Sequence, residues 1–225
     1  MLIDGFPAGS FQANCYVVAP AAGEECVIVD PGQDAVTALE AKLREHRLKP
    51  VAVLVTHGHL DHMWSVAPVC GARNIPAYIH PDDRELLSDP GKGISLTADV
   101  FGGLEFTEPD DVRELSDGTA LSIAGLELIV DHAPGHTRGS VTFRSAAEQV
   151  MFSGDLLFAG SIGRSDLPGG DYDTIIRSLG RVCLSLPDDT TVLPGHGPHT
   201  TIGRERATNP YLTEAAPFAG PTRGL

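Results

Sequence analysis

The chain has 225 residues, of which 42% are hydrophobic and 20% charged, and its formal net charge is −14. This acidity argues against nucleic acid or an anionic membrane as a partner, because both are polyanions. No run approaches the roughly 18 apolar residues that a membrane-spanning helix needs, and the N-terminus lacks the pattern of a secretory signal. The four cysteines form no C-x-x-C pair and indicate free thiols in a reducing compartment. We therefore expect a cytoplasmic protein.

The first half of the chain alternates strands with helices. Two β-rich runs, at 14–20 and 25–32, are separated by a short turn and predict a hairpin. Residues 34–48 have apolar side chains at helical spacing and end before a proline, so they predict a helix. The next expected elements are a buried strand at 50–56, a helical segment at 62–74 and a strand at 75–80.

The second half begins with weak periodicity and several glycines and prolines over 82–111, which predicts a long excursion with about one helical turn. The elements expected after it are strands within 119–135 and at 140–145 and 149–155, a helix at 173–186, a last strand at 190–197 and a short polar C-terminus. The expected elements form two blocks along the chain, each with strands followed by a helix. We therefore expect an α/β (α+β) fold of two packed mixed sheets with external helices, in a single domain spanning 1–225.

The most informative motif is HGHLDH at 57–62, which directly follows the predicted strand at 50–56. It places four potential metal ligands in six positions: His57, His59, Asp61 and His62. Imidazole nitrogens and carboxylate oxygens together suit Zn²⁺, Fe or Mn²⁺ better than Ca²⁺ or Mg²⁺. The motif therefore predicts most of a metal site at the edge of a sheet.

Three later segments share one pattern, in which a strand and a glycine-containing turn lead to a potential ligand. The segments are APGH, SGD and PGH, and their candidate ligands are His136, Asp155 and His196. Glycine permits tight turns and close backbone approach, so each segment can present one side chain to a common point. His132 lies near His136, and we expect it to support the site or the core rather than to bind metal. We expect no functional role for His46, His80 and His199.

With these motifs the sequence resembles the metallo-β-lactamase superfamily. The resemblance runs from NCYVV and VDPG to PGHG and implies a four-layer αβ/βα sandwich with two metal ions at one edge. It implies that His57, His59 and His136 hold one metal and that Asp61, His62 and His196 hold the other, with Asp155 bridging them. True β-lactamases of the family usually carry a cysteine at the position of Asp155 or lack the paired Asp61 and His62 ligands. The sequence therefore argues against antibiotic hydrolysis.

Within the superfamily, the segments APGHTRGS, SGDLLFAGSIGRSDLPGGD and NPYL are most similar to glyoxalase II, the hydroxyacylglutathione hydrolases, and their short-chain relatives. The resemblance implies a substrate such as S-D-lactoylglutathione, hydrolysed by a hydroxide that bridges two divalent metals, with Asp61 orienting the nucleophile. Arg164 stands where glyoxalase II places a basic residue against glutathione, although a structural pairing with Asp166 is an equal alternative. Arg138 is a second candidate contact for an anionic acyl-thiol.

Two departures leave the thiol portion of the substrate open. The tyrosine that glyoxalase II carries after its last histidine ligand is absent from PGHGPHT, and Thr213 stands where its NPF-x-R motif has arginine. The alternative is a persulfide dioxygenase of the same superfamily, which would use one iron held by His57, His136 and Asp155. His196 in PGHG favours a second metal and hence the hydrolase. The sequence carries no signal of oligomeric state.

Overall fold

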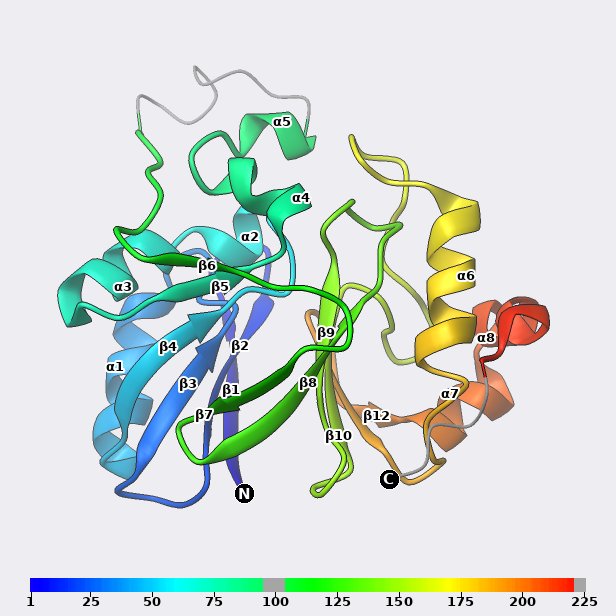
Figure 1. Ribbon diagram of the computed structural model, residues 1–225, viewed down its shortest axis with the longest axis horizontal. Coiled ribbons are helices and arrows are strands. Elements are labelled where there is room, and N and C mark those ends of the chain that lie inside the picture. The colour runs from blue at the N-terminus through cyan, green and yellow to red at the C-terminus, as the bar shows by residue number, and fades with distance from the viewer. Residues whose placement is uncertain (95–103, 221–225) are drawn as a thin grey trace.

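The computed structural model describes residues 1–94 and 104–220 and shows two six-stranded sheets packed face to face (Figure 1). The first sheet has the order β1-β2-β3-β4-β5-β6, and the second has the order β12-β11-β10-β9-β8-β7. Both sheets are mixed, since β3 to β6 pair in parallel and β10 pairs in parallel with β11, while the other pairs are antiparallel. The fold class expected from the sequence is confirmed.

The strands of the first sheet come from the N-terminal half: β1 Leu2–Ala8, β2 Ala13–Ala19, β3 Glu25–Val29, β4 Lys49–Leu54, β5 Ala77–Ile79 and β6 Val112–Glu114. Those of the second come from the C-terminal half: β7 Ala120–Ile123, β8 Leu126–His132, β9 Val141–Ser145, β10 Val150–Gly154, β11 Thr191–Pro194 and β12 Thr200–Thr201. The strands β1, β6 and β12 were not expected from the sequence. Each half of the chain thus builds one sheet.

The helices flank the sheets or lie at one end of them (Figure 1). Their bounds are α1 Ala35–His46, α2 Leu60–Met63, α3 Val66–Arg73, α4 Pro81–Arg84, α5 Gly91–Ile94, α6 Tyr172–Val182, α7 Ile202–Thr208 and α8 Pro210–Ala215, with short 3-10 turns at Glu85–Leu87 and Ala216–Phe218. In the described part of the chain, no helix is long and apolar enough to cross a membrane.

Both faces of the central strands are buried, because each sheet packs on the other sheet and on helices. In β2, Cys15 and Val17 belong to the core beneath α1 and α3, whereas Tyr16 and Val18 point into the core between the sheets. The second sheet repeats this alternation against α6, α7 and α8. Buried strands of this kind read as continuous apolar runs, which is why the sequence predicted them well.

Three parts of the sequence prediction need correction. The segment 62–74 is two short helices, and α2 starts at Leu60, so it includes part of the HGHLDH motif. The excursion at 82–111 holds α4, a 3-10 turn and α5 rather than one helical turn, while its residues 95–103 lie outside the described part. The C-terminus is not merely polar, because α7 and α8 bury Ile202, Leu212 and Ala215 against the second sheet.

Candidate metal centre

Four strand ends deliver all seven predicted ligands to one edge of the two sheets. The HGHLDH segment follows β4, His136 follows β8, Asp155 directly follows β10, and His196 follows β11. The strands β8, β10 and β11 run in the same direction, since β9 is antiparallel to both β8 and β10 and β11 is parallel to β10. Thr56 links the sheets, because its carbonyl accepts a hydrogen bond from the Val141 amide at 2.8 Å.

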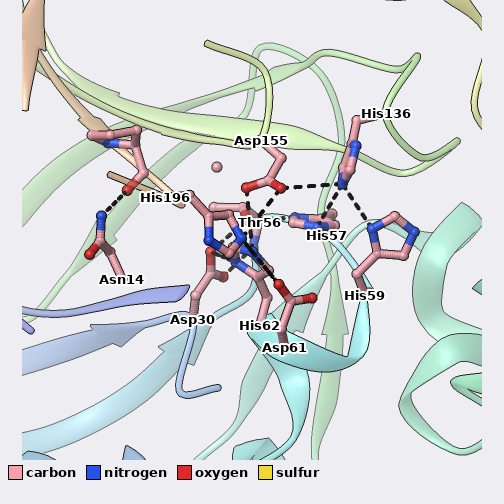
Figure 2. Close-up of polar contacts among 12 residues, drawn as sticks. Asn14, Asp30, Thr56, His57, His59, Asp61, His62, His136, Asp155 and His196 are labelled. Carbon is pink, nitrogen blue, oxygen red and sulfur yellow. Dashed lines mark hydrogen bonds and ion pairs between the residues drawn. The ribbon is translucent and has the colours of Figure 1, made fainter. Parts of the chain in front are cut away.

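His57, His59 and His136 form a first group of buried imidazoles, whose ring nitrogens converge (Figure 2). His136 Nε2 lies 2.8 Å from His59 Nδ1 and 3.1 Å from His57 Nε2. Four ligands placed tetrahedrally about Zn²⁺, at roughly 2.0–2.1 Å from it, lie roughly 3.3 Å apart. The three nitrogens are therefore spaced much like the ligands of a single transition-metal ion.

Asp61, His62 and His196 form a second group beside the first. His196 Nε2 lies 3.1 Å from Asp61 Oδ2 and 3.2 Å from His62 Nε2. Asp155 stands between the groups, with Oδ1 3.3 Å from His62 Nε2 and Oδ2 3.5 Å from His136 Nε2. Its Oδ1 is buried and accepts no hydrogen bond from any described residue. A carboxylate with one oxygen toward each group suits a bridging ligand.

Neighbouring acceptors fix the protons of three histidines on Nδ1. His136 Nδ1 donates to the Arg164 carbonyl at 2.6 Å, and His62 Nδ1 donates to Asp30 Oδ2 at 2.9 Å. Thr56 Oγ1 donates its proton to Asp30 Oδ2 at 2.6 Å. It therefore accepts the hydrogen bond from His57 Nδ1, which lies 3.1 Å away. In each neutral ring the lone pair is then left on Nε2, which is the atom directed into the cluster. Such supporting hydrogen bonds are typical of metal-binding histidines.

The electrostatics of the cluster also favour cations. Burial and the neighbouring imidazoles hold the pKa of His57 well below its usual range, and burial lowers the pKa of His59 to about 3. Both rings are therefore neutral at pH 7, the form that binds metal. Burial alone would lower the pKa of His62, but Asp155, Asp61 and Asp30 together raise it to about 10. The carboxylates thus attract positive charge to the second group, and the donor set fits two divalent metals.

The role of Asp30 was only loosely indicated by the sequence, as part of the VDPG turn. Besides His62, its carboxylate accepts hydrogen bonds from Thr56 N at 2.8 Å and Thr56 Oγ1 at 2.6 Å. One buried carboxylate therefore supports histidines of both groups, His62 directly and His57 through Thr56. The only sequence signal was an acidic residue at the end of a buried strand.

The two arginines predicted near the substrate differ in their surroundings. Arg164 is exposed and pairs through two nitrogens with Asp166, at 2.7 and 2.8 Å, while its carbonyl oxygen accepts from His136. The Arg138 side chain makes no hydrogen bond or ion pair with the described residues, and it lines a cavity of about 210 Å³. Gly93 lines the same cavity, and a Cβ atom there would lie 3.1 Å from His59 Cδ2. The cavity therefore adjoins the first group.

The NPYL segment lies in the C-terminal helices rather than at the metal cluster. Asn209 caps α8 through the Tyr211 amide, and its Nδ2 donates to the Ser161 carbonyl at 3.1 Å. Glu205, which is fully buried, accepts from Gly160 N at 2.7 Å. These contacts connect the C-terminal helices to the loop that follows Asp155, so the first residue of NPYL has a structural role in this chain.

A family model for the metallo-β-lactamase superfamily matches residues 8–196, which include all seven residues of the cluster. The chain belongs to the metallo-β-lactamase superfamily. It is 53% identical over 215 residues to the Mycobacterium leprae protein ML0493, covering 94% of this chain and 99% of that protein. It is 33% identical over 214 residues to the hydroxyacylglutathione hydrolase GloC of Haemophilus influenzae, covering 94% of this chain and 98% of GloC.

Two solved structures are similar over nearly their whole length. The BLEG-1 B3 metallo-β-lactamase has a TM-score of 0.83 and 40% identity, covering 94% of this chain and 100% of that one. TTHA1623, solved in a di-iron-bound form, has a TM-score of 0.79 and 42% identity, covering 93% of this chain and 100% of that one. Together with the donor set, the family indicates an enzyme with a centre for divalent metals.

Proposed function

We propose that this chain is a binuclear metallohydrolase of the glyoxalase II type, which cleaves the acyl thioester of a small acyl-thiol such as S-D-lactoylglutathione. The observation that carries the proposal is the division of seven donors into two groups with Asp155 between them. The similarity to GloC, a hydroxyacylglutathione hydrolase, supports the thioester as the substrate class. We further propose that the protein acts in the cytoplasm as a single domain, without nucleic acid or membrane partners.

In this proposal His57, His59 and His136 hold one metal, Asp61, His62 and His196 hold the other, and Asp155 bridges them. The metals, Zn²⁺ or alternatively Fe or Mn²⁺, would supply a Lewis acid for the thioester carbonyl and a water whose pKa lies near 7. Asp61 keeps 21% of its side chain exposed, so it can both bind metal and accept a hydrogen bond from the attacking water. Its pKa lies well below the usual range, because His62 and His196 outweigh the opposing effect of burial.

The substrate would lie against the cavity beside the first group. Arg138 lines this cavity and has no anionic partner among the described residues, so we propose that it binds a carboxylate of the thiol. Arg164 is the second candidate, but a substrate anion would have to compete with Asp166 for its guanidinium group. An acidic protein can bind an anionic substrate in this way, because bound metals reverse the local charge.

A second candidate is β-lactam hydrolysis, which the similarity to the BLEG-1 B3 enzyme favours. This relative is 40% identical to the chain and is described as a B3 metallo-β-lactamase. Against it stands the expectation from the sequence, which was argued from Asp155 at a position where β-lactamases of the family usually carry a cysteine. The persulfide dioxygenase alternative gains no comparable support, because the second group of donors would have no part in a mononuclear iron site.

The proposal is tested by measuring the loss of thioester absorbance when metal-replete protein is given S-D-lactoylglutathione. We expect turnover that Arg138→Ala weakens through a higher KM, while Arg177→Ala, a control at an exposed site, leaves it unchanged. Two parallel assays use a chromogenic cephalosporin and oxygen uptake with glutathione persulfide. Turnover of either of these substrates without thioester hydrolysis would contradict the proposal and select the corresponding alternative.

A further inference from the structure

A second buried carboxylate, besides that of Asp30, contacts the segments that carry the first group. Asp83 belongs to the short helix α4, and only 1% of its surface is exposed. Its Oδ2 accepts hydrogen bonds from Gly58 N at 2.9 Å and from Thr137 Oγ1 at 2.6 Å. Its Oδ1 accepts from Gly139 N at 2.7 Å.

The three donors belong to the two segments that carry the first group. Gly58 lies between His57 and His59, and Thr137 and Gly139 follow directly on His136. The histidines of these segments are 77 to 79 residues apart in the chain, and the segments follow strands of different sheets. A single carboxylate therefore ties together the backbones that present all three imidazoles. No comparable contact joins Asp83 to Asp61, His62 or His196 among the described residues.

The packing around this carboxylate leaves little freedom. A Cβ atom on Gly139 would lie 2.7 Å from Asp83 Cγ, and one on Gly58 would lie 3.0 Å from the Asp83 carbonyl oxygen. Asp83 makes no ion pair with a described residue, so its charge is held only by neutral donors. A buried carboxylate without a cation is costly, and a metal bound by the adjacent imidazoles would offset that cost.

We propose that Asp83 is the positioning residue of the first group, setting the geometry and the metal affinity of His57, His59 and His136 without comparable influence on the second group. The inference rests on the proposed two-metal centre. Groups that support metal ligands typically contribute about 10- to 100-fold to metal affinity. We therefore expect loss of the Asp83 carboxylate to weaken one metal position by about this factor.

The test separates the two positions genetically. A His196→Ala background leaves the first group intact, and a His57→Ala background leaves the second. Asp83→Asn is added to each, and Zn²⁺ affinity is measured by competition with a chromogenic chelator, with near-UV circular dichroism to verify folding. Asp82→Asn is the matched control, since Asp82 is the adjacent carboxylate, is exposed, and has a side chain that makes no hydrogen bond with either ligand segment in the described part of the chain.

We expect Asp83→Asn to weaken Zn²⁺ binding about 10- to 100-fold in the His196→Ala background and to leave it within about twofold in the His57→Ala background. Unchanged affinity in the first background, or equal weakening in both, would overturn the inference. If Asp83→Asn does not fold, Thr137→Val removes one of the three hydrogen bonds and must show the same preference for the first group. Thioester turnover has no part in this readout, so a failed substrate assay would overturn the proposed function alone.

Discussion

Among the described residues, histidines and carboxylates have ligand atoms within 4.8 Å of one another in the metal centre and in two further clusters, one of His80, Asp82 and His132 and one of Asp4, Glu45 and His46. The buried metal centre and the cluster around His80 differ in how their rings are oriented. In the first group of the metal centre, the rings of His57 and His59 each stand nearly perpendicular to His136, at 78° and 89°. In the cluster around His80, the rings of His80 and His132 are stacked at 4.0 Å with only 6° between their planes. Lone pairs lie in the plane of an imidazole ring, so stacked rings direct them along parallel planes rather than to one point.

The hydrogen bonds of the cluster around His80 lead to the same conclusion. His80 Nδ1 accepts from the Asp82 amide at 3.3 Å, and His132 Nε2 donates to the Arg138 carbonyl at 2.8 Å. The lone pair of the neutral His80 ring is therefore used by the Asp82 amide, and its proton lies on Nε2. In the metal centre, by contrast, the contacts of His57, His62 and His136 leave the lone pair on Nε2, directed into the cluster. Proximity alone is therefore a poor criterion for a metal site, and ring orientation and tautomer decide.

The largest effect is expected from His57→Ala. Removing a ligand of the first group should lower thioester turnover by at least about 10³-fold, the upper end of what one electrostatic group contributes in an enzyme. The bound metal should fall from two ions to one per chain, measured by elemental analysis after dialysis. A variant that kept both turnover and two metals would show that the first group is not a ligand set.

Asp61→Asn should retain the fold and lower turnover by about 10²- to 10³-fold, because the amide replaces both a ligand charge and an acceptor for the nucleophile. The measurement is kcat and KM under saturating metal, and the loss should fall mainly in kcat. Asp34→Asn is the control, since Asp34 is exposed and outside the cluster. Unchanged kcat in Asp61→Asn would remove Asp61 from the reaction.

Asp30→Asn should weaken metal binding by about 10- to 100-fold, because His62 and Thr56 lose the carboxylate that fixes their protons. Asp30 has a backbone φ of 49°, in the left-handed region that asparagine tolerates, so the substitution should not strain the turn. Metal competition with a chelator measures the effect. Affinity equal to that of the unaltered protein would show that the ligand rings orient themselves without this acceptor.

His132→Ala should have the smallest effect, with two metals retained and turnover unchanged. Burial, followed by the charge of His132, lowers the pKa of His80, so the folded protein resists protonation of that ring. Because the pKa of His80 is lower in the folded state than in the unfolded state, the free energy of unfolding decreases as the pH falls from about 6.5 toward the pKa of the folded state. Removing His132 should raise the pKa of His80, followed by NMR titration, and reduce this acid-side loss. A lost metal would instead make the stacked pair part of the site.

The sequence was sufficient to predict much of the fold and all seven residues of the cluster. Buried strands gave long apolar runs, and each ligand followed such a run through a short segment containing glycine. The structure adds the convergence of their ring nitrogens, which no sequence spacing could show. Whether all seven bind metal stays a prediction until the variants above are measured.

The features that the sequence did not predict depend on contacts between distant parts of the chain. Asp83 meets Gly139 across 56 residues, and nothing around it in HPDDR distinguishes it from the exposed Asp82. The helices α7 and α8 are short and mostly polar, and they form because a few buried side chains pack on the second sheet. Arg164 was equally open to two interpretations, and the structure shows its ion pair with Asp166.

The most direct test of this account is anomalous X-ray diffraction from crystals of the zinc-loaded protein, recorded above and below the zinc edge. We predict two peaks, one among His57, His59 and His136 and the other among Asp61, His62 and His196, with Asp155 in contact with both. We predict no peak beside His80 and His132. A single peak shared by the two groups, or a peak at the stacked pair, would contradict the account.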